Sequence, residues 1–195
     1  MKKILSVILT VGILFSFSAC SGAATPSDAV SGLMKALKAY DTAAIEEYAD
    51  GKLIDDTNAD SLQIEELRLT LKNLEFEILS TEENGNEATV RALIENVNMQ
   101  AVMTDYLTET IDLVYEKMEA SSIDQQDLQK RALKIFQDAL EDHKKETATT
   151  SAEIRLTKQN GRWIVNWDDV LKDAVTGTLF SAMDKLGDFS DTSGE

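Results

Sequence analysis

Residues 75–97, EFEILSTEENGNEATVRALIENV, decide the fold, because the apolar positions change there from a helical period to a strand period. Apolar and polar residues alternate at 76–78 and again at 90–94, on the two sides of Asn84-Gly85. Alternation is typical of a strand with one buried face, and Asn-Gly between two such runs favours a type I′ turn. We therefore predict an antiparallel hairpin whose return strand ends near Asn98.

A second hairpin is predicted near the C-terminus. Residues 150–156 alternate, Asn160-Gly161 supplies the turn, and Trp163, Val165 and Trp167 alternate on the return. Two hairpins predict one antiparallel sheet of about four strands. The two tryptophans share a strand face, so we expect them in the core, with the mouth of a binding pocket as the alternative.

The rest of the chain shows helical spacing. Three helices are expected before the first hairpin: one with Thr25 as N-cap and Pro26 in its first turn, one capped by Asp41, and one starting at Asp60 or Ser61. A last helix begins at Asp168 or Asp169 and carries apolar residues as far as Leu186. Helices on one face of an antiparallel sheet give an α+β fold.

Two long helices are predicted between the hairpins. The first carries an apolar stripe that we expect to face the core, formed by Met103, Leu107, Ile111, Val114 and Met118. The second starts at a capping box of Ser122 with Gln125. With 195 residues and no Pro after Pro26, the simplest organisation is a single domain over 26–187, followed by a frayed tail at 188–195.

The N-terminus has the layout of an export signal. Met1-Lys2-Lys3 is basic, residues 4–17 are apolar, and small residues follow. An apolar run of 14 residues is shorter than the roughly 20 that span a bilayer. An ordinary signal peptide with a core thiol, or a membrane helix, remains the alternative.

Phe17-Ser18-Ala19-Cys20 resembles the lipobox of bacterial lipoproteins, with Phe in place of the usual Leu. The resemblance implies that residues 1–19 are cleaved and that Cys20 receives a diacylglyceryl group on the extracytoplasmic face of the cell membrane. Two acyl chains anchor a protein stably. The linker that follows, residues 21–25, reaches at most about 17 Å, so the domain is expected close to the membrane.

Two further stretches resemble the nuclear-transport-factor-two-like, or cystatin-like, domains found in uncharacterised lipoproteins of Gram-positive bacteria. They are Lys-Ala-Tyr-Asp-Thr-Ala-Ala-Ile at 38–45 and Asn-Gly-Arg-Trp-Ile-Val at 160–165. The resemblance implies a cone-shaped sheet, here with inserted helices over 100–143, and a homodimer formed through the sheet.

Composition excludes several chemistries. The chain has one Cys and one His, and these counts exclude a disulfide framework, a thiolate zinc site and any site that needs two histidines within one chain. A net charge of −16 argues against nucleic acid as a partner. The chain has no nucleotide-binding, zinc-protease, nucleophile-elbow or EF-hand motif, so no cofactor or metal is expected. His143 is expected at a solvated helix end, where a cation favours the helix dipole.

Carboxylates are the remaining candidates for chemistry. The densest groups are Asp55-Asp56-Asp60, Glu82-Glu83 and Asp168-Asp169, which we interpret as solvated turns or helix caps; weak Ca²⁺ binding at 82–87 is the alternative.

Three functions are open. The first is a non-catalytic module that binds a ligand, an envelope component or a partner protein; the second is a small isomerase, dehydratase or hydrolase; the third is an assembly module of the envelope. The enzyme needs a carboxylate base beside a tyrosine in an apolar pocket, and the candidates are Tyr40, Tyr48, Tyr106 and Tyr115, all otherwise expected in the core. A filled core with an exposed apolar patch favours a protein partner instead.

Overall fold

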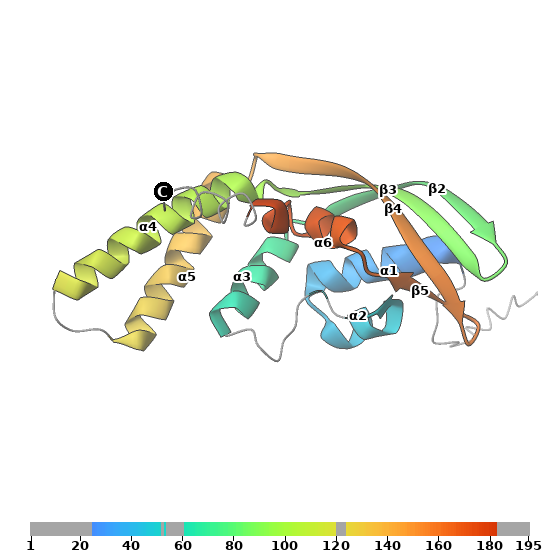
Figure 1. Ribbon diagram of the computed structural model, residues 1–195, viewed down its shortest axis with the longest axis horizontal. Helices are drawn as coiled ribbons and strands as arrows, with labels where there is room; N and C mark the ends of the chain where they lie inside the picture. Colours follow the sequence, from blue (N-terminus) through green and yellow to red (C-terminus); the bar gives the residue numbers. More distant parts are fainter. Residues whose placement is uncertain (1–24, 52, 54–60, 120–123, 183–195) are drawn as a thin grey trace, which may run out of the picture.

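A five-stranded sheet with helices on one face forms the body of the protein (Figure 1). The computed structural model describes residues 25–51, 53, 61–119 and 124–182. Its elements are α1 (Pro26–Ala39), α2 (Thr42–Tyr48), β1 (Ala49–Asp50), α3 (Ser61–Leu71), β2 (Glu75–Asn84), β3 (Glu87–Val97), α4 (Met99–Glu119), α5 (Gln125–Asp142), β4 (Thr147–Gln159), β5 (Arg162–Asn166) and α6 (Asp169–Val175).

The strand order is β1-β5-β4-β3-β2, and the sheet is open. Three of the four pairings are antiparallel, while β1 pairs in parallel with β5. The α+β class and both hairpins are confirmed. The fifth strand was not predicted, because Ala49–Asp50 is too short to show alternation.

The two hairpin turns differ in a way that the sequence did not show. In β4–β5 both loop residues have positive φ, 51° at Asn160 and 81° at Gly161, which is the predicted type I′ turn. In β2–β3, Asn84 pairs with Glu87, so the loop is Gly85-Asn86 and only Gly85 has positive φ, at 63°. A glycine at the first loop position suits a type II′ turn, and the type I′ prediction was wrong there.

The predicted helix starts are largely confirmed. The Thr25 hydroxyl accepts from the Asp28 N–H at 3.1 Å, and the Asp41 carboxylate accepts from the Ala44 N–H at 3.1 Å. Each bond satisfies a backbone donor that has no partner within the helix. The start of α5 differs from the prediction, because Asp124 is its N-cap; Ser122 lies outside the described residues.

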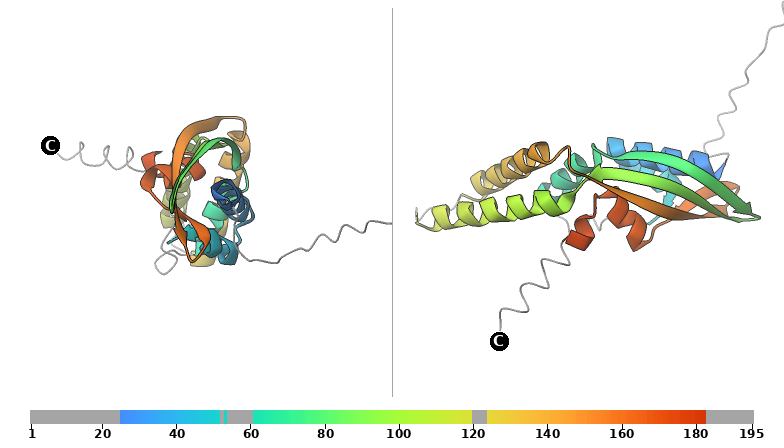
Figure 2. Two further views of the ribbon diagram at one scale, coloured as in Figure 1. Left: turned by 90° about the vertical axis from the view of Figure 1, so that its right-hand side faces the viewer. Right: turned by 90° about the horizontal axis from the view of Figure 1, so that it is seen from above.

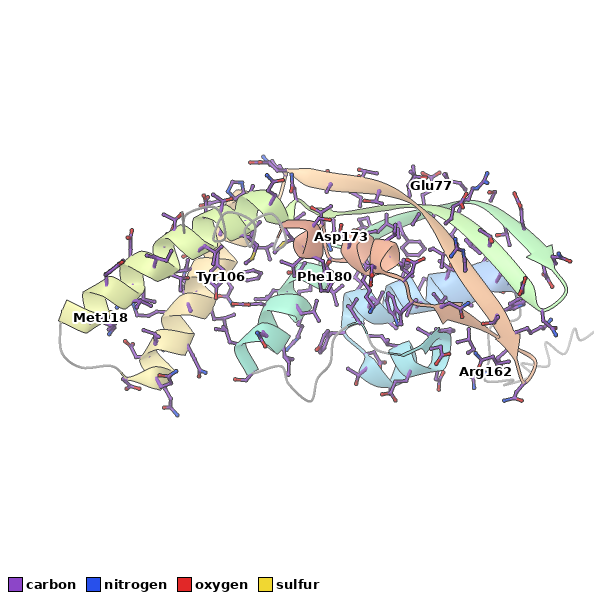
Figure 3. The ribbon with its side chains drawn as sticks, in the orientation of Figure 1. Glu77, Tyr106, Met118, Arg162, Asp173 and Phe180 are labelled. Atoms are coloured by element: carbon purple, nitrogen blue, oxygen red, sulfur yellow. The ribbon has the colours of Figure 1, made fainter. Side chains whose placement is uncertain are left out.

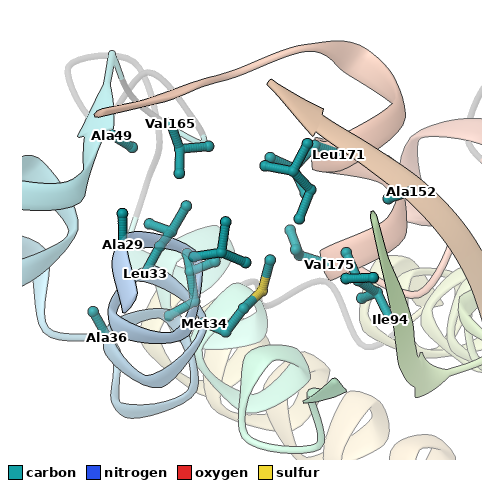
Figure 4. Close-up of a cluster of buried hydrophobic side chains, with 14 of the residues drawn as sticks. Ala29, Leu33, Met34, Ala36, Ala49, Ile94, Ala152, Val165, Leu171 and Val175 are labelled. Atoms are coloured by element: carbon teal, nitrogen blue, oxygen red, sulfur yellow. The ribbon is translucent and has the colours of Figure 1, made fainter. Parts of the chain in front are cut away.

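The main core lies between the sheet and the helices α1 and α6 (Figures 2 and 4). Alternate residues of β3 point into it, among them Val90, Ala92 and Ile94, each fully buried. Trp163 is 1% exposed, so its predicted place in the core is confirmed. Trp167 is half-buried against the same cluster.

A second core lies beyond the sheet, between α4, α5 and α3. Its centre is an edge-to-face pair of Tyr106 and Phe136, with ring centroids 5.4 Å apart. Figure 1 shows the α4–α5 hairpin extending along the long axis, away from the sheet. The molecule is therefore elongated, with the sheet at one end and the helical hairpin at the other.

The C-terminal helix predicted to run on to Leu186 is interrupted. After α6 the chain adopts positive φ at Gly177 and Thr178, both 66°, and the Thr178 N–H bonds the Asp173 carbonyl at 2.8 Å. Residues 179–182 are helical again. The break is needed because Gly177 crosses the junction of β3 and α4, where a Cβ would lie 1.9 Å from the Val97 carbonyl oxygen.

Two hydrogen bonds hold this crossing. The Gly177 carbonyl accepts from the Met99 N–H at 2.9 Å, and the fully buried Asn96 amide donates to the Val175 carbonyl at 2.7 Å. The crossing fixes the start of α4 against α6. It therefore sets the direction in which the helical hairpin leaves the sheet.

Candidate functional site

The helix α4 has two apolar faces, and only one of them is packed. Met99, Val102, Tyr106 and Leu113 are buried against α5 and α3. The stripe predicted to face the core lies mostly on the other side: Met103 and Leu107 are half-buried, and the rest of it is exposed. The prediction was wrong because both stripes repeat at helical spacing, and spacing alone does not say which one meets a neighbour.

The open part of this helix carries four large apolar side chains. Ile111 is 54% exposed, Val114 38%, Tyr115 65% and Met118 62%, at positions i, i+3, i+4 and i+7. We call these four residues the outer α4 face. Only six large apolar side chains in the described residues are exposed, and four of them are here, so this surface is a patch rather than scattered exposure. Figure 3 shows Met118 at the end of the hairpin.

Charged contacts on the opposite side lock α4 to α5. Arg131 on α5 donates to both carboxylate oxygens of Glu116, at 3.1 and 3.0 Å, and Lys117 donates to Asp127 at 2.6 Å. The Arg131 hydrogen bond lowers the pKa of Glu116, and the Lys117 bond lowers that of Asp127. These pairs leave the outer α4 face turned away from α5.

A hollow of about 350 Å³ lies between the two helices on the charged side. It is lined by Glu109, Asp112, Leu113, Glu116, Arg131, Lys134 and Ile135. Glu109 and Asp112 are exposed and make no ion pair within the part of the chain that the structure describes. Asp112, three residues before Tyr115, therefore places an acidic side chain beside the outer α4 face.

His143 is the C-cap of α5, as expected, but its side chain is only 20% exposed. Nε2 lies 2.7 Å from Asp105 on α4, and Nδ1 lies 2.8 Å from Glu146 before β4. The hydrogen bond to Asp105, then that to Glu146, raises the pKa of the imidazole. It borders an open hollow of about 430 Å³, and its contact with Asp105, 38 residues away, was not visible in the sequence.

The other predicted acidic groups are not brought together. Cys20 and Asp55-Asp56-Asp60 lie outside the described residues. Glu82 and Glu83 are exposed at the end of β2, while Asp168 caps α6 by accepting from the Leu171 N–H at 2.8 Å. Within the described residues no three His, Cys, Asp or Glu side chains are placed to share a metal ion.

The four tyrosines lie apart. Tyr40 and Tyr48 are half-buried against the main core, Tyr106 is 9% exposed, and Tyr115 is exposed, contrary to the core prediction for it. The Tyr106 hydroxyl donates to Glu66 at 2.6 Å, which joins α4 to α3. Neither residue of this pair lines the two hollows described above.

Comparisons with known proteins add little to this geometry. No family model matches the chain, and no curated protein matches it. A search of solved structures found a crystal structure of a "putative lipoprotein (ycdA)" from Bacillus subtilis, 19% identical, with a TM-score of 0.43. The match covers 80% of this chain and 48% of that one, so the chain spans about half the length of its neighbour.

This similarity is too low to assign a function, and it leaves the predicted lipobox and the predicted cone-shaped domain as predictions. Across the described ranges, none of the helices has the length and apolar character required to cross a bilayer.

Proposed function

We propose that the chain is a lipid-anchored extracytoplasmic protein that binds a partner protein, without catalysis, through the outer α4 face. The N-terminal sequence supports the anchor, since the single Cys of the chain stands at the position that a lipobox requires. A mature chain with diacylated Cys20 is held at the membrane surface without a spanning helix.

The observation that carries the binding role is the exposure of four large apolar side chains on one helix face. Apolar side chains exposed together on one surface mark interaction sites. The main core is filled by large buried side chains, among them Trp163 and Leu33. The combination favours a protein surface as the partner over a small molecule held inside the fold.

The anchor is tested with the full chain in its producing cells. Cys20→Ala is expected to move the protein from the membrane fraction to the soluble exported fraction and to abolish labelling by radioactive fatty acid. Cys20→Ser is the matched conservative variant, because it keeps the size of the side chain and removes the thiol. Membrane retention of both variants would refute the anchor.

The binding surface is tested by site-specific photo-cross-linking in intact cells. A photoreactive residue at Tyr115 is expected to give a discrete, saturable cross-link to a second protein. The matched control is Glu153, which is exposed on the outer face of the sheet. Equal cross-linking from both positions, or none from Tyr115, would contradict a binding role for the outer α4 face.

A further inference from the structure

We propose that the outer α4 face docks a cationic amphipathic helix of a partner protein, at the end of the molecule opposite the start of α1. This inference rests on the proposed function and names the chemistry of its partner. Three observations carry it: the shape of the face, the charge around it, and its distance from the start of α1.

The shape fits a helix. The four exposed side chains follow one another at i, i+3, i+4 and i+7, and the half-buried Leu107 and Met103 continue the row toward the sheet. From Met103 to Met118 the row is about 23 Å long at 1.5 Å per residue. A straight apolar row of this width accepts the apolar side of a second helix, as in helix-in-groove recognition. The partner would pack on α4, on the side that faces away from α5.

The charge selects a basic partner. Glu109, Asp112 and Glu116 line the hollow between α4 and α5, and of these three Asp112 lies one turn from Tyr115 and so borders the outer α4 face. Apart from Lys117, which is bound to Asp127, every charged residue of α4 is acidic. The whole chain carries −16. Lysine or arginine beside the apolar stripe of a partner helix would meet Asp112, which has no ion-pair partner in the described part of the chain.

A second copy of this chain fits the face less well. Two copies, each carrying −16, would bring their Asp112 side chains toward a shared interface, and like charges brought together at an interface oppose association. The four exposed side chains also extend over only two helical turns, whereas a stable dimer buries about 800 Å² on each partner. The face alone does not supply that area.

The position of the outer α4 face, at the other end of the molecule from the start of α1, does not favour a membrane as its occupant. Ser27 at the start of α1 lies 2.6 Å from Thr81 on β2, which is paired with Val90. From that point the chain runs along β3 and α4 for about 50 Å before it reaches Met118. Figure 1 shows the start of α1 and the end of α4 at opposite ends of the long axis. An anchor within about 17 Å of Thr25 therefore lies at the other end of the long axis from the outer α4 face.

The test uses the lipidated chain in phosphatidylcholine nanodiscs and two synthetic peptide probes of about 18 residues. Both peptides carry the same leucine stripe, flanked by lysines in one and by glutamates in the other. By fluorescence anisotropy the lysine peptide is expected to bind with 1:1 saturation and at least tenfold more tightly than the glutamate peptide. Its affinity is expected to fall as salt is raised, since exposed charges are screened. Empty nanodiscs give the lipid background.

Three variants locate the binding. The double variant Ile111→Ser with Met118→Ser is expected to lower the affinity for the lysine peptide at least tenfold. Asp112→Lys is expected to lower the affinity for the lysine peptide severalfold and to raise the affinity for the glutamate peptide. Val170→Ser, which changes an equally exposed apolar residue on α6, is the control and is expected to leave both affinities unchanged.

The outcomes separate this inference from the proposed function. If the two peptides bind equally and Ile111 with Met118 is required for both, the partner is not selected by charge, and the binding surface stands. If the chain dimerises by mass photometry and the double serine variant abolishes dimerisation, the occupant is a second copy. If neither peptide binds while the Tyr115 cross-link persists in cells, the partner is not a helix. Loss of that cross-link as well refutes the proposed function itself.

Discussion

Replacing Gly177 with alanine tests whether the crossing of the chain over the start of α4 holds the two cores together. A non-glycine residue at a φ of 66° costs about 1–2 kcal/mol in backbone conformation. The new Cβ would lie 1.9 Å from the Val97 carbonyl oxygen, where contacts under 3.0 Å are essentially never seen. The segment around Gly177 must therefore move by about 1 Å, because the obstacle is backbone rather than a flexible side chain.

That movement lengthens the Met99–Gly177 hydrogen bond and strains the buried one from Asn96 to Val175. Losing a typical bond costs about 0.5–1.5 kcal/mol, and leaving a buried polar group unpaired costs about 1–3 kcal/mol. With the backbone cost, the free energy of unfolding is expected to fall by about 3–6 kcal/mol. This is a large share of the roughly 5–15 kcal/mol that stabilises a typical domain.

The assay is urea denaturation followed by far-ultraviolet circular dichroism, and the matched control is Gly161→Ala. Gly161 has a φ of 81° and nothing within 4 Å of a built Cβ, so its variant carries the backbone cost alone. The difference between the two variants measures the overlap with Val97. If Gly177→Ala and Gly161→Ala lose the same stability within about 0.5 kcal/mol, the argument from the crossing is refuted.

Three further predictions concern the helical hairpin. Leu113→Ala, at a side chain that is 3% exposed, should lower the free energy of unfolding by about 2–5 kcal/mol. Met118→Ala, at 62% exposure, should change the free energy of unfolding by less than about 0.5 kcal/mol. Equal effects in urea denaturation would mean that the two faces of α4 are wrongly assigned. Tyr106→Phe removes the donor to Glu66 and should lower the free energy of unfolding by about 1–3 kcal/mol. Tyr115→Phe is the exposed control. An unchanged denaturation midpoint for Tyr106→Phe would contradict a stabilising hydrogen bond to Glu66. Because Asp105 and Glu146 raise the pKa of His143 above its unfolded value, its stabilising contribution is complete below about pH 6.5 and is lost as the pH rises through the higher folded pKa. His143→Gln should therefore destabilise the protein at about pH 5.5 and have little effect at about pH 9, and a constant effect across that range would contradict the role of the charged imidazole.

The parts of the fold that local chemistry determines could be predicted from the sequence. Thr25 and Asp41 act as caps through bonds to backbone donors three residues away, and Asn160-Gly161 supplies the two positive φ angles of its own turn. Such features depend on a few neighbouring residues.

What could not be predicted depends on contacts between distant segments. The break after α6 exists because Gly177 meets Val97, eighty residues earlier, and β1 forms only because Ala49 and Asp50 meet β5. The candidate site is of the same kind. One apolar stripe on α4 was visible as periodicity, but only the position of α5 decides that this stripe stays exposed while another is packed.

The separation of the two cores has a consequence for how sequences of this kind can diverge. The exposed side chains of α4 belong to neither buried cluster, so substitutions at Ile111, Tyr115 or Met118 do not disturb the packing of Phe136 or Trp163. The need to keep the protein stable, which restricts substitutions at core positions, therefore does not restrict substitutions there. A lineage can change the surface at the end of the hairpin while the sheet end stays constant. Comparison of orthologues would then show the hairpin tip changing together with the partner that it binds, beside a slowly changing Gly177.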